Sequence, residues 1–173
     1  MPTTVLISGD AIAQRTRELA ADIHRDYADA GQLHIVCVLK GAFMFLADLV
    51  RAIDMPVTLD FMALSSYAKG TTSSGEVRLL KDLDSALEGR HVLIVEDIVD
   101  TGLTLQYLQD ILGARGPKSV RTACFLNKPS RRQTDVRVEY IGFTIDDHFV
   151  VGYGLDYNER YRNLPYIAVL EEG

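Results

Sequence analysis

Apolar residues follow two spacings along the chain, and stretches with the two spacings alternate. Short runs of consecutive apolar and β-branched residues predict buried strands, at residues 34–39, 57–64, 91–95, 119–126 and 167–170. Stretches in which apolar residues recur every three or four positions predict helices, over residues 8–31, 41–53 and 105–112. Strands that alternate with helices favour parallel pairing, so the pattern predicts an α/β fold with a mainly parallel, twisted sheet flanked by helices.

One polar stretch interrupts this pattern. Residues 65–75 contain two glycines and almost nothing to bury, which predicts a mobile loop near 65–77, with an edge strand over 76–80 on its far side. The first helix and the last segments are expected to form a small cap, or hood, over the ligand-binding edge of the sheet. No internal repeat or linker is visible, so residues 1–173 are expected to form a single domain.

Composition and charge narrow the classes of function. The 173 residues include 18 basic and 24 acidic side chains, a formal charge of −6, which argues against general nucleic-acid binding. No apolar run approaches the ~20 residues needed to cross a membrane, and the first residues do not resemble a secretion signal. Cys37 and Cys124 lie in predicted apolar strands and are expected to be buried free thiols, which fits a reducing cytoplasm. We therefore expect a cytoplasmic protein without membrane or nucleic-acid partners.

Residues 91–104 contain the most specific chemistry of the sequence. The strand over 91–95 is expected to stop at two adjacent carboxylates, Glu96 and Asp97, and a short turn with a third acid, two threonines and a glycine then leads into the helix over 105–112. Such a loop lies beyond the carboxyl end of a strand, where open parallel sheets bind ligands. Backbone amides at a helix start, flanked by hydroxyls, can bind phosphate, and the carboxylates suit hydrated magnesium or a sugar diol.

Other interpretations of this run explain less. A loop with merely solvated acids accounts for any one carboxylate, but not for three beside a glycine turn and a helix start. A phosphorelay receiver domain also has an acidic pair after a strand, but its phosphate-accepting aspartate ends a later strand, and residues 119–126 contain no aspartate. Walker-type nucleotide binding fails because no glycine run precedes a Lys-Ser or Lys-Thr pair. Gly152 and Gly154 lack a third glycine and a helix, so dinucleotide binding has weak support.

The acidic run resembles the phosphoribosyl-diphosphate signature of the purine phosphoribosyltransferases. With three further motifs, at residues 39–43, at Lys128 and at residues 149–159, the resemblance covers nearly the whole chain and is to the hypoxanthine–guanine branch of that family. It implies transfer of ribose 5-phosphate from 5-phosphoribosyl 1-diphosphate to hypoxanthine or guanine, which yields IMP or GMP and pyrophosphate, with Mg²⁺ as cofactor. It also implies a homo-oligomer, either a dimer or a tetramer.

The resemblance assigns roles to individual residues. Asp100 matches the proposed general base for the proton on purine N7. The residues expected to bind the phosphoribosyl group are Glu96, Asp97, Asp100, Thr101, Gly102, Leu103 and Thr104. Those expected at the pyrophosphate are Lys40, Gly41 and Arg162. In the family, the Lys-Gly backbone of this loop often has an unusual cis peptide. The residues expected in the lid are Ser66 and Tyr67. Those expected at the purine are Lys128, Phe149, Val150 and Asp156, and the expected metal ligands are Glu96, Asp97 and Asp156.

The expected purine contacts predict which base is used. Lys128 donates a hydrogen bond to a 6-oxo group and opposes the 6-amino group of adenine, which is another donor. Backbone carbonyls at Val150 and Asp156 can accept the 2-amino group of guanine. Two alternatives stay open: a relative that prefers xanthine, and a nucleotide-sensing, RNA-binding regulator of the same fold. The charge of −6 and the purine-type residues argue against the regulator.

Overall fold

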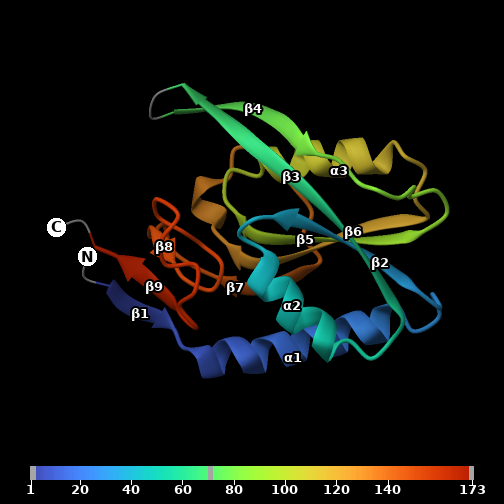
Figure 1. Ribbon diagram of the computed structural model, residues 1–173, viewed down its shortest axis with the longest axis horizontal. Helices are drawn as coiled ribbons and strands as arrows, with labels where there is room; N and C mark the ends of the chain where they lie inside the picture. The colour runs from blue at the N-terminus through green and yellow to red at the C-terminus, as the bar shows by residue number, and fades with distance from the viewer. Residues whose placement is uncertain (1–2, 70–71, 172–173) are drawn as a thin grey trace.

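Six strands form the central sheet within residues 3–69 and 72–171, the residues that the computed structural model describes (Figure 1). The order across the sheet is β4-β3-β2-β5-β6-β7; β4 is antiparallel to β3, and every other neighbouring pair is parallel. The strands are β2 (Leu33–Leu39), β3 (Val57–Lys69), β4 (Thr72–Lys81), β5 (His91–Val99), β6 (Ser119–Asn127) and β7 (Tyr140–Thr144). The predicted α/β fold with a mainly parallel sheet is confirmed.

Helices cover both faces of this sheet. In Figure 1, α1 (Gly9–Asp26) and α2 (Phe43–Ala52) lie below the sheet and α3 (Leu103–Gly113) lies above it, and a short 3-10 helix, η1 (Pro129–Arg131), follows β6. Side chains alternate along a strand, so each central strand contributes to two cores. Ile35 packs toward α1 and α2 in a cluster that contains Phe45, whereas its neighbour Val36 packs toward α3 in a cluster that contains Leu108.

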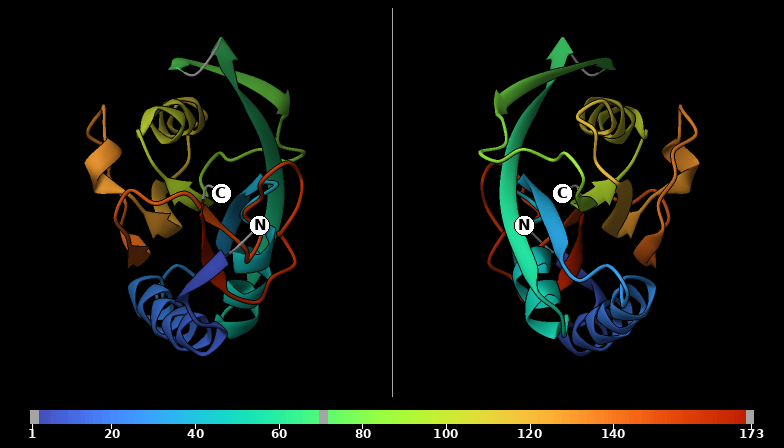
Figure 2. Two further views of the ribbon diagram at one scale, coloured as in Figure 1. Left: turned by 90° about the vertical axis from the view of Figure 1, so that its left-hand side faces the viewer. Right: turned by 90° about the vertical axis from the view of Figure 1, so that its right-hand side faces the viewer.

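A second, antiparallel sheet forms the hood. It consists of β1 (Thr3–Ile7), β9 (Ile167–Leu170) and β8 (Val150–Val151), in the order β1-β9-β8. The left panel of Figure 2 looks onto this hood. The predicted cap from the terminal segments is confirmed, but the first helix is not part of it. Helix α1 packs against α2 and β7 instead, because its buried stripe of Ile12, Leu19 and Ile23 faces the core of the central sheet.

The loop predicted over residues 65–75 is largely strand. β3 and β4 continue as a hairpin in which Ala68 pairs with Ser73 and Lys69 with Thr72. The prediction was wrong because strand pairing uses backbone hydrogen bonds, which a polar sequence can form beyond the edge of the core. Mobility of this hairpin stays a prediction, and residues 70–71 lie outside the described residues.

Several element boundaries also differ from the prediction. Strand β5 does not stop at the acids but continues to Val99, because Glu96 pairs with Cys124 on β6. The connection to α3 therefore shrinks to residues 100–102, and α3 begins at Leu103 rather than at residue 105. Helix α1 ends at Asp26 rather than near residue 31.

Both cysteines are buried free thiols, as predicted. Burial raises the pKa of Cys37 and of Cys124 to about 12, so neither is a reactive thiolate at neutral pH. The cytoplasmic location stays a prediction. None of the helices in the described ranges combines the length and the apolar character that crossing a membrane requires.

Asp60 on β3 is a buried carboxylate that accepts hydrogen bonds from the connection between β4 and β5. Its side chain accepts hydrogen bonds from the backbone N–H groups of Phe61, Asp84 and Ser85 and from the Ser85 hydroxyl, at 2.9 to 3.0 Å. Burial by itself raises the pKa of this carboxyl, but the hydrogen bonds outweigh it and the pKa is lowered. Asp60 therefore stabilises the fold above the ordinary carboxyl pKa, and this contribution is lost as the pH falls through the lowered pKa.

We expect Asp60→Ala to lower the free energy of unfolding by about 1–3 kcal/mol at neutral pH, because three backbone donors lose their acceptor. Urea unfolding at neutral and acidic pH measures this, and the gap to the wild type should shrink on acidification. Asp84→Ala is the matched control, since it removes an 86%-exposed carboxylate from the same connection. A gap that widens toward acidic pH would overturn this account of Asp60.

Candidate active site

The candidate site lies at the carboxyl ends of β2 and β5, where the order of the sheet reverses. From β2 the chain proceeds outward to β3, and from β5 it proceeds outward to β6 and β7 on the opposite side. An open α/β sheet forms its ligand crevice at such a switch point. Two cavities of about 420 and 520 Å³ adjoin there, and both are lined by Asp100 and Arg131.

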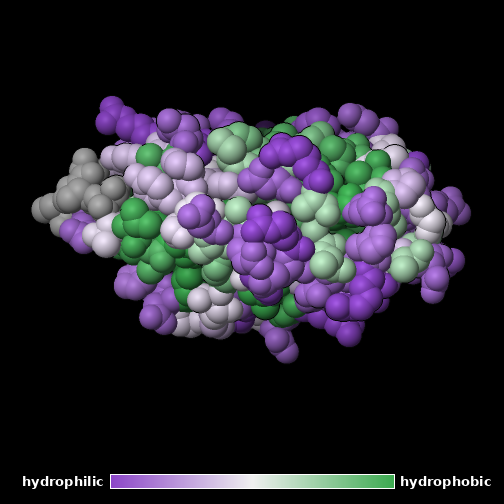
Figure 3. All heavy atoms as spheres, turned by 90° about the horizontal axis from the view of Figure 1, so that it is seen from below, coloured by the Kyte–Doolittle hydropathy of each residue, from purple (hydrophilic) through white to green (hydrophobic). Residues whose placement is uncertain are grey.

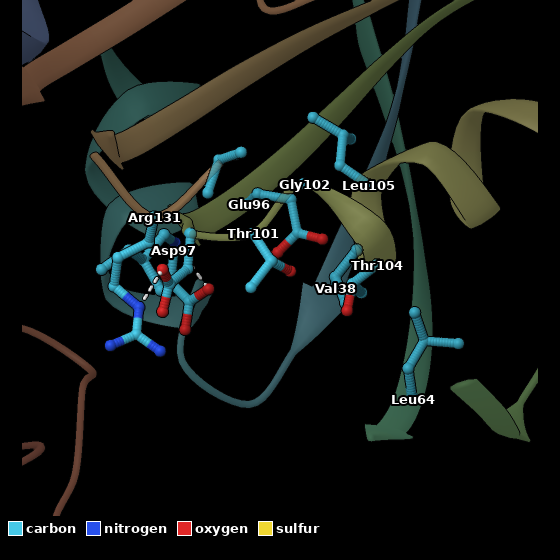
Figure 4. A pocket seen from close by; sticks show the side chains of 12 residues that line it. Val38, Leu64, Glu96, Asp97, Thr101, Gly102, Thr104, Leu105 and Arg131 are labelled. Carbon is cyan, nitrogen blue, oxygen red and sulfur yellow. Dashed lines mark hydrogen bonds and ion pairs between the residues drawn. The ribbon is translucent and has the colours of Figure 1, made fainter. Parts of the chain in front are cut away.

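The first cavity contains the loop between β5 and α3 (Figure 4). Gly102 has a φ of +86°, and an added Cβ would lie 3.0 Å from the Thr134 carbonyl oxygen, so glycine allows the sharp turn into α3. The first N–H groups of α3 have no acceptor within the helix and can bind an anion. Thr101 and Thr104 line the cavity beside them. The local geometry therefore fits the predicted phosphate-binding loop, although the Leu103 side chain is not among the lining residues.

The adjacent carboxylates Glu96 and Asp97 line the same cavity from the end of β5. Figure 4 shows both side chains beside Thr101, with Arg131 at one end of the cavity and Leu64 at the other. Burial raises the pKa of Glu96 well above the usual carboxyl range, and the charge of Asp97 raises it further. Burial also raises the pKa of Asp97, whose Oδ1 accepts a hydrogen bond from Ile98 N at 2.6 Å.

The segment after β2 brings the predicted pyrophosphate residues against these acids. A Cβ added to Gly41 would lie 1.9 Å from Asp97 Oδ2, so only glycine allows this approach. The cis peptide bond joins Leu39 to Lys40, one bond earlier than the Lys40–Gly41 bond that the family resemblance implies. Lys40 Nζ lies 3.4 Å from Glu159 Oε2, in an ion pair whose two side chains are both about two-thirds exposed.

The second cavity has the character of a site for a flat, polar molecule. Besides Asp100 and Arg131, it is lined by Ile98, Lys128, Asp147, Phe149, Val150, Leu155 and Asp156. Lys128 is 7% exposed, and its Nζ lies 3.7 Å from Asp147 Oδ1. Phe149 is 54% exposed, and its ring meets Tyr157 edge to face at 5.7 Å. The four predicted purine residues are thus brought together in one cavity.

The hood residue Asp156 does not join the other predicted metal ligands directly, whereas the charge of Arg162 acts on Asp97 and lowers its pKa against the effect of burial. Asp156 Oδ1 lies 3.5 Å from Arg162 Nη2, and its Oδ2 accepts a hydrogen bond from Glu159 N. Among the described residues, no group of three or more metal-ligating side chains comes together. Asp156 therefore does not share one cluster with Glu96 and Asp97. The backbone of the predicted lid residues Ser66 and Tyr67 belongs to β3, while their side chains lie outside the described residues.

Sequence reasoning missed four charged residues at the site: Arg131, Arg132, Asp147 and Glu159. Arg131 Nε lies 2.8 Å from Asp100 Oδ1, and Arg132 Nη1 donates to the Asp100 carbonyl oxygen at 3.0 Å. Each lies close in sequence to a residue that was identified, in a polar stretch typical of a solvated loop. Proximity to Lys128 was the available signal for the two arginines, but charge alone does not separate a site residue from a surface residue.

Comparison with known proteins agrees with this geometry. The family model described as the phosphoribosyl transferase domain matches residues 5–158. The hypoxanthine-guanine phosphoribosyltransferase of Bacillus subtilis (strain 168) is 52% identical over 167 residues, 96% of this chain and 92% of that protein. The hypoxanthine phosphoribosyltransferase of Haemophilus influenzae is 51% identical, over 97% of this chain and 96% of that protein.

Solved structures give the same relationship in three dimensions. A hypoxanthine-guanine phosphoribosyltransferase from Bacillus anthracis, with a HEPES molecule in its active site, superposes with a TM-score of 0.92 at 45% identity, over 97% of this chain and 98% of that chain. A hypoxanthine phosphoribosyltransferase from Staphylococcus aureus has the same TM-score at 46% identity, over 97% of this chain and 91% of that chain. The chain therefore belongs to the phosphoribosyl transferase family.

Proposed function

We propose that this protein is a purine salvage enzyme that converts hypoxanthine or guanine and 5-phosphoribosyl 1-diphosphate into IMP or GMP and pyrophosphate. The observation that carries the proposal is the pair of cavities that share Asp100. One contains a turn suited to phosphate, the buried Glu96 and the half-buried Asp97, and the other contains a buried lysine and an exposed aromatic ring. A sugar phosphate in the first cavity and a 6-oxopurine in the second would meet beside Asp100.

The reaction forms a bond between purine N9 and C1′ of the ribose and breaks the bond between C1′ and the diphosphate oxygen. The proton on purine N7 must leave as N9 attacks, and we assign its acceptance to the Asp100 carboxylate, which lines both cavities. Positive charge that develops on the ribose during bond breaking resembles that in glycoside hydrolysis. The neighbouring carboxylates Glu96 and Asp97 can stabilise this charge or bind the ribose hydroxyls.

We also propose Mg²⁺ as cofactor, held by Glu96 and Asp97 together with the substrate. Burial raises the pKa of both carboxyls, and the charge of Asp97 raises that of Glu96 further, so a divalent cation suits this position. Mg²⁺ binds through one or two carboxylates plus substrate phosphates, so a third protein ligand is not required. When bound there, Mg²⁺ would supply positive charge to offset that of the pyrophosphate. Arg162 and the Lys40–Gly41 backbone are proposed to contact the pyrophosphate from the hood side.

A homo-oligomer is the final part of the proposal. Phe43 on α2 and Leu59 on β3 are 37% and 44% exposed, which supports a contact between copies of the chain. Figure 3 views the molecule from below and shows apolar residues in patches between hydrophilic ones on that face. Among the relatives, one structural study concerns the oligomeric state of the Trypanosoma cruzi hypoxanthine phosphoribosyl transferase.

The decisive experiment offers the purified protein 5-phosphoribosyl 1-diphosphate and magnesium with hypoxanthine, guanine, xanthine, adenine or uracil in parallel. We expect nucleotide from the first two bases alone, and none after magnesium is chelated. A preference for xanthine would change the proposed base specificity but not the proposed reaction class. Tight binding of RNA without turnover of any base would overturn the proposal in favour of a regulator. Light scattering on the same preparation tests the oligomer, which a monomeric mass would contradict.

A further inference from the structure

Arg131 lies in the wall between the two cavities. It ends the short helix η1, three residues after Lys128, and it lines both the phosphate-loop cavity and the purine-side cavity. Figure 4 shows its side chain at one end of the first cavity, beside the acidic residues. About half of the side chain is exposed. The two cavities thus share the long cationic side chain of Arg131 as well as Asp100.

The contact between Arg131 and Asp100 is specific to one oxygen of the carboxylate. Arg131 Nε lies 2.8 Å from Asp100 Oδ1. This oxygen is buried, and within the described residues it accepts no well-aligned hydrogen bond, so the guanidinium is the charge that lies against it. The Asp100 side chain as a whole is 39% exposed, which leaves Oδ2 as the oxygen available to a substrate.

The neighbouring arginine acts on the backbone rather than on the carboxylate. Arg132 Nη1 donates to the Asp100 carbonyl oxygen at 3.0 Å, and its Nη2 donates to Asn127 Oδ1. In addition, the N–H of Gln133 donates to the Thr101 carbonyl oxygen at 2.8 Å. The segment after β6 therefore fixes the main chain of the 100–102 loop without Arg131, and Arg131 adds control of the side chain alone.

Arg131 also connects Asp100 to the purine-side lysine. Its Nη1 lies 3.7 Å from Asp147 Oδ2, and the other oxygen of Asp147 lies 3.7 Å from Lys128 Nζ. Charges therefore alternate in sign along Asp100, Arg131, Asp147 and Lys128. This row of ion pairs fixes the position of Asp100, proposed to accept the N7 proton, relative to Lys128, proposed to bind the 6-oxo oxygen.

We propose that Arg131 is a positioning residue that holds the Asp100 carboxylate with Oδ2 turned toward the purine. This inference rests on the proposed transferase function and on Asp100 as its base. A base acts only when its oxygen is within hydrogen-bond reach of the proton, and a misplacement of about 1 Å can reduce a rate about 10²-fold. Half-exposed ion pairs contribute little to folding stability, so loss of Arg131 affects catalysis more than the fold.

The test compares Arg131→Gln, Arg131→Lys and Arg137→Gln in steady-state assays with hypoxanthine. Arg137 is the matched control, because its side chain is 89% exposed and lies in the same connection between β6 and β7. We expect Arg131→Gln to lower kcat about 10–100-fold with little change in the KM for 5-phosphoribosyl 1-diphosphate. Arg131→Lys should recover part of the loss, and thermal melting should show that all three variants are folded.

A double-mutant cycle with Asp100→Asn separates positioning from a general structural role. If Arg131 acts through Asp100, Arg131→Gln causes no further fall in kcat once the carboxylate has gone. Equal falls in both backgrounds, or a raised KM for the diphosphate with an unchanged kcat, overturn the positioning role. Absence of turnover in the wild type would instead refute the proposed function itself, so the two failures are distinguishable.

Discussion

Replacement of Asp100 by asparagine is expected to lower kcat about 10²–10⁴-fold, the range that a positioned general base contributes. The amide keeps the shape of the side chain but does not accept the N7 proton. Affinity for 5-phosphoribosyl 1-diphosphate should be nearly unchanged, because we assign the phosphate contacts to the backbone and hydroxyls of the 101–104 segment. Single-turnover kinetics together with equilibrium binding of the diphosphate substrate separates the two effects.

Asp146→Asn is the control for that experiment, since it removes the charge of an exposed aspartate that lines neither of the two cavities. It should leave turnover as in the wild type. Near-normal kcat in the Asp100 variant would remove this residue as the base. A large loss of diphosphate affinity would show instead that the carboxylate mainly shapes the phosphate-binding loop.

The second large effect is expected at Lys128, through base specificity. Lys128→Met retains the buried aliphatic length and removes the donor for the 6-oxo group. A hydrogen bond to a charged group contributes about 1.5–3 kcal/mol, so kcat/KM with hypoxanthine should fall about 10–150-fold. The value of kcat/KM with adenine should fall much less, because the 6-amino group of adenine no longer faces another hydrogen-bond donor.

The measured quantity is the ratio of kcat/KM for hypoxanthine to that for adenine, compared with the ratio in Lys118→Met. Lys118 is exposed and directly precedes β6, whereas Lys128 directly follows it, so the two lysines lie at opposite ends of the same strand. An unchanged ratio in the Lys128 variant would rule out the contact that we assign to it. Residue Asp147, which pairs with Lys128, is 52% exposed, so its loss of a partner should not unfold the protein.

The acidic run shows what the sequence can and cannot predict. Its chemistry is local: two adjacent acids, a glycine in a short turn and a helix start are all visible between residues 96 and 105. The length of strand β5 is not local, because it depends on pairing with β6, a segment more than 20 residues away. The sequence therefore predicted the strand, the turn and the helix start of the acidic run, but it placed the end of the strand wrongly.

The same distinction explains the other errors. Residues 65–69 and 72–75 form strands because two polar segments pair with each other, and neither segment reveals this pairing alone. The amphipathic pattern of α1 predicted that one face is buried, but it did not say against which layer. Arg131 was missed because its partner, Asp100, lies 31 positions away in the chain and only the parallel pairing of β5 and β6 brings them together.

The hood imposes an order on the maturation of the enzyme at the ribosome. A nascent chain that has emerged through Thr144 already contains all strands of the central sheet, including the phosphate-binding turn. β8, which follows Phe149, has no sheet partner until residues 167–170 are synthesised, and β1 waits for the same segment. Because a domain folds as a unit, the second cavity, which Val150 of β8 lines, is completed only after this last strand has emerged.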